Sequence, residues 1–131
     1  EVGATTGRPR RCGWFDAVSV KRIIQSNSVS ALCLTKIDVL DGLENIKICT
    51  SYDEDESKKA FAECMELEDV NPSYIEIEGW PEPTAGINNY DDFPQKAKNF
   101  VEKIAEVCGV PVDIVSTGPD DASTILINQE I

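Results

Sequence analysis

The sequence predicts an α/β fold in which a mixed sheet carries flanking helices. Short apolar or alternating segments that favour strands recur along the chain, at 29–35, 45–52, 73–80 and 112–118. Segments with helical periodicity alternate with them, and this order of elements is typical of α/β domains. The 131 residues are one domain's worth of chain, and the 41% that are hydrophobic suffice for one core.

The first helix is expected to begin after Asp16, which can cap it, and to run to about Gln25. Phe15 and Val20 have the spacing of a hydrophobic staple across that start. The next segment, VSALCLT at 29–35, is an apolar run bounded by polar residues. That pattern predicts a buried strand.

The middle of the chain holds two predicted strands on either side of an acidic stretch. Segments 45–52 and 73–80 both alternate apolar and polar residues, as half-buried strands do. Between them, residues 53–69 hold eight acids and two lysines, which indicates a solvated excursion. A short turn or helix is expected around 39–43, and a Pro/Gly/Asn-rich loop at 81–92.

The strongest helical pattern covers 93–108, where apolar residues form one stripe. Asp92 and Gln95 have capping-box spacing, and Gly109 is placed to end the helix. A strand at 112–118 runs into a turn, and TILIN near the end predicts a last short strand.

The net charge of −12 is unevenly distributed and limits the possible partners. The first 22 residues carry five basic residues, including all four arginines, against two acids. The remaining residues carry seven lysines against 22 acids, so the bulk surface should repel the phosphate backbone and no nucleic acid partner is predicted for it. The basic corner suits a small anion, because the planar guanidinium fork binds phosphate or carboxylate bidentately.

Other residue types exclude further classes. No apolar run approaches the roughly 18 residues of a membrane-spanning helix. The chain has no His, and its five cysteines show no CxxC spacing, so neither a zinc site nor a disulfide framework is predicted. This use of cysteine is typical of reduced thiols in the cytoplasm.

Two polar motifs follow predicted strands. In TKID (35–38), the Asp38 carboxylate can accept hydrogen bonds from both donors of guanine, a pair that adenine lacks. The alternative is that Asp38 caps a short helix, with Asp41 three residues on. In STGP (116–119), a hydroxyl and the side-chain-free Gly118 allow close approach to a base, and the alternative is an ordinary turn.

A third motif, ATTGRPR at 4–10, combines hydroxyls, a glycine and two arginines that can project toward one anion. The alternative is a mobile basic tail. Taken together and in order, GATTGRPRRCGWFD, NSVSALCLTKIDVLDGL and GVPVDIVSTGPD resemble the C-terminal part of the adenylosuccinate synthetase family. The resemblance covers nearly the whole chain and fades over 53–69.

The resemblance implies that 1–131 is the C-terminal third of a longer cytoplasmic ligase, with a substrate loop at 1–11 and a GTP guanine-side α/β region at 12–131. The family joins IMP and L-aspartate, using GTP and Mg²⁺, to give adenylosuccinate, GDP and phosphate. It is homodimeric, and its fold is related to P-loop GTPases. Its phosphate loop, catalytic aspartate and histidine, and Mg²⁺ ligands lie in the N-terminal part, so this chain alone is expected to be inactive and to hold no catalytic or metal-ligating residue.

The resemblance also assigns roles in the loop. Thr5, Thr6 and Arg8 are expected to hold the aspartate carboxylates, with Arg8 also at the IMP site and Arg10 near the GTP phosphates. The expected loop consists of Ala4, Thr5, Thr6, Gly7, Arg8, Pro9 and Arg10.

On the nucleotide side, the resemblance favours guanine recognition by Asp38 over the helix cap. The expected guanine pocket has Lys36, Ile37 and Asp38 on one side and Ser116, Thr117 and Gly118 on the other. A different class remains open, in which the chain is a free-standing nucleotide- or anion-binding module whose arginine loop grips an acidic segment of a partner.

Overall fold

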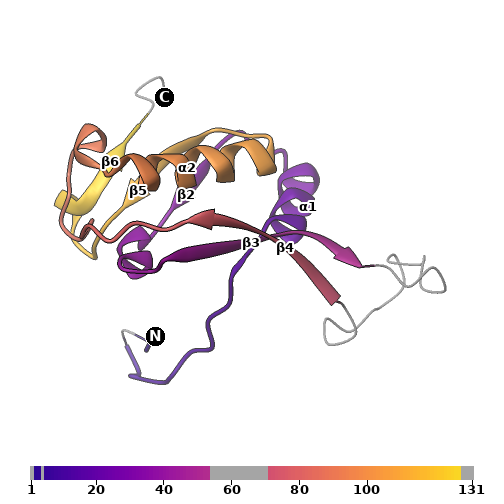
Figure 1. Ribbon diagram of the computed structural model, residues 1–131, viewed down its shortest axis with the longest axis horizontal. Helices are drawn as coiled ribbons and strands as arrows, with labels where there is room; N and C mark the ends of the chain where they lie inside the picture. The colour runs from indigo at the N-terminus through magenta and orange to yellow at the C-terminus, as the bar shows by residue number, and fades with distance from the viewer. Residues whose placement is uncertain (1, 4, 54–70, 128–131) are drawn as a thin grey trace.

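The computed structural model describes residues 2–3, 5–53 and 71–127. These residues form two α-helices and six strands, with three short 3₁₀ helices between them (Figure 1). In chain order they are β1 (Phe15–Asp16), α1 (Ala17–Asn27), β2 (Leu32–Leu34), η1 (Ile37–Leu40), β3 (Asn45–Asp53), β4 (Asn71–Glu78), η4 (Tyr90–Asp92), α2 (Gln95–Cys108), β5 (Val112–Ser116), η5 (Asp121–Ser123) and β6 (Thr124–Leu126). The α/β prediction is confirmed.

The strands described form two sheets rather than the one mixed sheet that was predicted. In the first, β3 lies between β1, which is parallel to it, and β4, which is antiparallel. In the second, β5 lies between the parallel β2 and the antiparallel β6. Each sheet is mixed, and the parallel pairs bring the carboxyl ends of their strands to the same edge.

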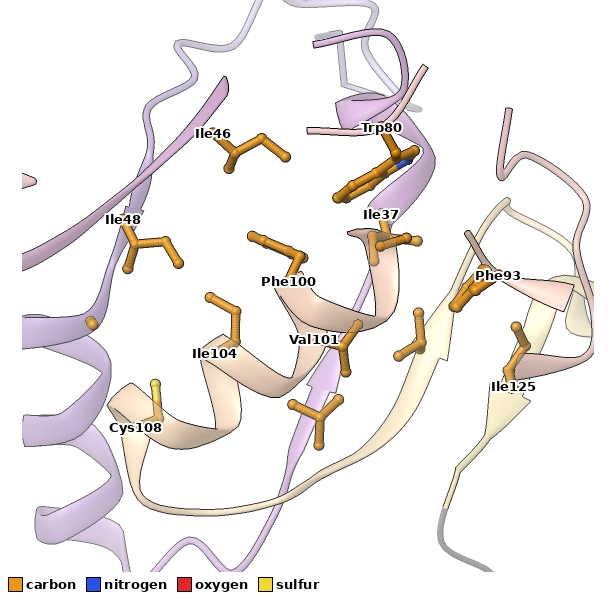
Figure 2. Close-up of a cluster of buried hydrophobic side chains, with 14 of the residues drawn as sticks. Ile37, Ile46, Ile48, Trp80, Phe93, Phe100, Val101, Ile104, Cys108 and Ile125 are labelled. Atoms are coloured by element: carbon orange, nitrogen blue, oxygen red, sulfur yellow. The ribbon is translucent and has the colours of Figure 1, made fainter. Parts of the chain in front are cut away.

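Helix α2 joins the two sheets through one hydrophobic core. Phe100 and Ile104 face Ile46 and Ile48 of β3, while Val101 lies on the side of the helix toward β5 (Figure 2). The Trp80 ring packs against Phe100 with ring centroids 5.7 Å apart. The predicted apolar stripe is thus confirmed as the core face of this helix, although its first residue, Phe93, is buried just before the helix begins.

The ends of the helices follow local chemistry, with one correction. Asp16 caps α1 as predicted, and Gly109 ends α2 in the left-handed conformation at φ +75°. The predicted capping box of Asp92 and Gln95 is wrong: α2 starts at Gln95 after Pro94, with no side-chain cap. Proline disfavours helical backbone in the residue before it, so Phe93 is extended and the helix begins later.

The Asp16 side chain also ties α1 to β3. Its Oδ1 accepts from the main-chain N–H groups of Val18 and Ser19 at 3.0 and 3.2 Å, and its Oδ2 accepts from the hydroxyls of Ser19 and Tyr52. Burial pushes the pKa of Asp16 upward, but these hydrogen bonds outweigh it and hold the pKa below its ordinary value of 3.8. Burial and the neighbouring carboxylate raise the pKa of Tyr52.

Two strand predictions need correction. The alternation of 45–52 holds through Ile48 and then breaks at a bulge, because β3 and β4 change register between Cys49 and Ser51. The predicted buried strand at 29–35 is shorter and half-buried: β2 is an edge strand that packs Leu32 and Leu34 on the core and exposes Cys33.

Most of the acidic stretch 53–69 lies outside the described residues. Neither α1 nor α2 is both long and apolar enough to cross a membrane, within the part of the chain that the structure describes.

Candidate functional site

The fold brings two of the three sequence motifs together. Strands β2 and β5 are parallel neighbours, with Leu34 opposite Val115, so the motifs that follow them lie at the same edge of the sheet. The main-chain N–H of Lys36 donates to Oγ of Ser116 at 3.1 Å. Ligands of α/β sheets bind at such carboxyl edges, so this is the candidate site.

The TKID motif makes a tight turn into η1. Lys36 has a left-handed backbone at φ +58°, which is uncommon for a residue with a side chain and is often found at functional sites. Ile37 is 3% exposed and anchors the turn in the core. Lys36 and Ile37 also line a hollow of about 220 Å³ with apolar neighbours that include Leu34, Val39 and Trp14.

Asp38, in the same turn, has a side-chain oxygen whose hydrogen-bonding capacity is not satisfied within the described residues. Its Oδ1 is buried and has no hydrogen-bond partner among the residues that the structure describes. The helix-cap alternative for Asp38 is wrong, because the N-cap of η1 is Lys36 and no side chain caps that helix. A buried acceptor without a partner is costly, and a ligand that supplies a donor removes the cost.

The STGP turn forms the other wall, and its three residues differ in availability. Ser116 is half-buried and accepts from Lys36. Thr117 is 1% exposed, and its hydroxyl donates to the carbonyl of Ile87 at 2.8 Å, so that side chain faces the protein rather than the open site. A Cβ at Gly118 would lie 2.9 Å from Ser123 Oγ, so a larger residue there would displace Ser123.

The arginine loop is a compact turn on the protein surface. Val2 pairs with Pro9 in an antiparallel bridge, and the Gly3 N–H donates to the Arg8 carbonyl at 2.9 Å. Gly7 turns the chain at φ +63°, where other residues are strained. The side chains of this turn that the structure describes are exposed, namely Thr5, Thr6, Arg8, Pro9 and Arg10; Ala4 lies outside the described residues.

The structure does not bring this loop against the other two motifs. The loop at 5–10 lies below the two sheets in Figure 1, whereas Gly13 and Trp14 line the hollow beside Lys36. The approach of Arg10 to the GTP phosphates stays a prediction. The two motifs at the strand ends form one site, and the arginine loop is a separate surface.

One residue that the sequence indicated only as a neighbour of Asp38 has a larger role. Asp41 accepts hydrogen bonds from Trp80 and Thr84, both of which are fully buried. Its partners are about forty residues away in the sequence, so local spacing could not reveal them. The run LTKIDVLDGL marks the segment as unusual. It does not show that the Asp41 carboxylate bonds to the protein interior while the Asp38 Oδ1 has no partner among the described residues.

A divalent cation site needs several ligating side chains around one point. Within 2–3, 5–53 and 71–127, no three side chains of the kinds that ligate metals gather around one point. Those residues alone do not fit Mg²⁺, which prefers several oxygen ligands in octahedral geometry.

Comparison with known proteins places the chain in a family. The family model for adenylosuccinate synthetase matches residues 1–125. The chain is 50% identical to the adenylosuccinate synthetases of Nitrosomonas eutropha and of Neisseria meningitidis serogroup C, over 98% of its own length. It spans about 31% and 30% of those relatives.

A solved structure shows the same arrangement. The chain superposes with a TM-score of 0.85 on the fully ligated adenylosuccinate synthetase from Plasmodium falciparum, at 31% identity. The match covers 98% of this chain and 32% of that one. The similarity therefore extends over sequence and fold alike, for nearly all of the chain.

Proposed function

The chain belongs to the adenylosuccinate synthetase family, and we propose that it forms the nucleotide-side part of a GTP-dependent ligase that joins IMP and L-aspartate. The observation that carries this proposal is the buried Oδ1 of Asp38, near the shared end of β2 and β5, which has no partner within 2–3, 5–53 and 71–127. A carboxylate only accepts hydrogen bonds, and guanine offers two adjacent donors where adenine offers no such pair. GTP is therefore the co-substrate proposed for this site.

The proposed contacts follow from what each residue leaves available. Asp38 accepts from the ring N–H and the exocyclic amine of guanine, and the apolar stem of Lys36 covers a face of the base. Ile37 holds the turn in the core. Across the pocket, Ser116 and Gly118 approach the base or ribose, and Thr117 offers neither its hydroxyl nor its N–H, because both are used internally.

The arginine loop is proposed to bind the second substrate. Thr5, Thr6 and Arg8 hold the aspartate carboxylates, Arg8 also contacts IMP, and Arg10 approaches the GTP phosphates once the loop closes over the substrates. The exposure of these side chains and the left-handed Gly7 support this role. Guanidinium groups suit it because they bind carboxylate and phosphate in bidentate fashion.

The reaction proposed for the complete enzyme has two displacements. The 6-oxygen of IMP attacks the γ-phosphorus of GTP and GDP leaves; the aspartate amine then attacks C6, and phosphate leaves with the oxygen. The residues of this chain bind and orient the substrates. The phosphate loop, the catalytic aspartate and histidine, and the Mg²⁺ ligands are proposed to lie in the part of the relatives that this chain does not match.

The remaining family properties are proposed at the same level. These are a kinship of the fold to P-loop GTPases, a homodimeric assembly, a cytoplasmic location and a place in AMP synthesis from IMP. The chain on its own is proposed to be inactive, because positioning and charge stabilisation around the phosphates supply most of phosphoryl-transfer catalysis.

The test compares two proteins. The full-length protein that contains this chain should form adenylosuccinate, GDP and phosphate from IMP, L-aspartate and GTP in the presence of Mg²⁺. The isolated 131-residue chain should give no turnover above a no-protein control. A full-length protein without this activity, whose arginine loop instead binds an acidic peptide, would favour the free-standing binding module.

A further inference from the structure

We infer that Asp41 and Thr84 are positioning residues for the proposed guanine pocket, and that the segment 80–87, here named the strut, fixes the distance between its two walls. This inference rests on the function proposed above. It concerns residues that make no contact with the nucleotide themselves.

The first link fastens the strut to the wall that carries Asp38. Oδ1 of Asp41 accepts from the indole N–H of Trp80 at 2.7 Å and from the Thr84 hydroxyl at 2.6 Å. Oδ2 of Asp41 accepts from the main-chain N–H of Thr84 at 2.7 Å. Trp80 and Thr84 are both 0% exposed, and hydrogen bonds to a charged acceptor are short and strong when water is excluded.

The second link fastens the strut to the wall that carries Gly118. Within the strut, the N–H of Ile87 donates to the carbonyl of Thr84 at 3.0 Å. The carbonyl of Ile87 accepts from the hydroxyl of Thr117 at 2.8 Å. A continuous path of hydrogen bonds therefore runs from Asp41 through Thr84 and Ile87 to Thr117.

The path closes into a ring at the strand ends. The Lys36 N–H donates to Ser116 Oγ, which joins the two walls directly. Asp41 lies directly after the short helix η1, which carries Asp38. Because both oxygens of the Asp41 carboxylate accept hydrogen bonds, Asp41 fixes the position of the Asp38 carboxylate, whose Oδ1 has no partner among the described residues. Lys36 and Asp41 thus hold the wall that carries Asp38 at its two ends. The strut sets the distance between that wall and the STGP turn.

This distance matters because hydrogen bonds tolerate little displacement. A base held between Asp38 and the STGP turn needs donor–acceptor distances of about 2.7–3.2 Å on the side of the carboxylate, and the bond weakens steeply with misalignment. A wall displaced by an ångström loses guanine contacts without altering the reacting atoms. The effect of breaking the strut should therefore fall on the KM for GTP and not on kcat.

The test uses the full-length protein with Asp41→Asn, Thr84→Val and Thr84→Ser. Asp41→Asn and Thr84→Val should each raise the KM for GTP about tenfold, the scale of one charge-assisted hydrogen bond, with kcat within about twofold of wild type. Thr84→Ser keeps the hydroxyl and should restore the wild-type KM. The KM values for IMP and aspartate should not change.

Asp16→Asn is the matched control. Asp16 also accepts hydrogen bonds on both oxygens from main-chain N–H groups and hydroxyls, but it does so at the start of α1. It should lower the melting temperature and leave the KM for GTP unchanged.

Each result has a definite meaning. If Asp41→Asn and Thr84→Val melt earlier while the KM for GTP stays at the wild-type value, the strut serves stability alone and the inference is overturned. If Asp41→Asn does not fold, the contrast between Thr84→Val and Thr84→Ser decides in the same way. If the wild-type protein shows no reaction with GTP, IMP and aspartate, the proposed function fails and the strut's role fails with it.

Discussion

The arginine loop and the proposed guanine pocket at the strand ends differ in how the fold prepares them. The loop presents Thr5, Thr6 and Arg8 on an exposed turn that a few main-chain hydrogen bonds hold together. The proposed guanine pocket presents the Asp38 Oδ1, which is buried and unpartnered among the described residues, on a turn fixed by hydrogen bonds from Trp80 and Thr84 to Asp41. An exposed loop suits a ligand over which it closes, whereas reading a base by its donors needs walls that are already in place.

A pair of glycine substitutions should sharpen this contrast most strongly. A Cβ at Gly79 would lie 1.8 Å from the carbonyl oxygen of Leu43, whereas one at Gly7 would meet no described atom within 4 Å. Gly79→Ala should therefore cost about 3 kcal/mol or more of unfolding free energy, because backbone must move. Gly7→Ala should cost about 1 kcal/mol, the strain of a left-handed backbone.

Chemical denaturation of the full-length protein measures both values. Equal and small losses of unfolding free energy for the two variants would contradict the contrast. They would show that the segment leading into the strut at Gly79 tolerates a side chain as easily as the loop does at Gly7.

A change in the loop should alter aspartate use and spare the nucleotide. Arg8→Lys keeps the charge but loses the bidentate fork, and a hydrogen bond to a charged group contributes about 1.5–3 kcal/mol. In the full-length protein, kcat/KM for aspartate should fall roughly 10- to 100-fold, with the KM for GTP within twofold. Steady-state kinetics with an unchanged kcat/KM for aspartate would refute the assignment of Arg8.

The smallest effect should come from Asp16, a carboxylate that serves neither region. Loss of its helix cap in Asp16→Asn should cost about 1 kcal/mol at pH 7. The folded pKa of Asp16 lies below its unfolded value, so its contribution is complete above about pH 4 and is lost as the pH falls through the folded pKa.

The difference in melting temperature between wild type and Asp16→Asn should accordingly shrink below about pH 4. A difference that stays constant down to pH 2 would show that the hydrogen bonds do not depend on the ionised carboxylate.

Local chemistry made part of the fold predictable. Asp16 and Gly109 mark helix ends because a short acceptor side chain and a left-handed glycine satisfy the first and last main-chain groups. The predicted start of α2 at Phe93 is wrong, because Pro94 disfavours helical backbone in the residue before it. That effect is stronger than the capping-box spacing of Asp92 and Gln95. The division into two sheets depends on strand pairing between distant segments, which periodicity does not encode.

The candidate site was likewise predictable only in part. Motifs at the ends of two strands could be expected to meet if those strands were parallel neighbours, and β2 and β5 are. The sequence could not assign opposite roles to Asp38 and Asp41, because the donors that satisfy Asp41 come from Trp80 and Thr84. It could not show either that the hydroxyl of Thr117 bonds inward to Ile87.

The most direct test of the account is the nucleotide preference of Asp38→Asn in the full-length protein. Asparagine presents one acceptor and one donor, so one half of the guanine pair becomes donor against donor, whereas xanthine carries an oxygen that can accept the new N–H. We predict that kcat/KM for GTP falls by about 100-fold or more while kcat/KM for XTP rises. A kcat/KM for GTP within a few-fold of wild type, together with a lower melting temperature, would contradict it and show that the Asp38 carboxylate serves the fold alone.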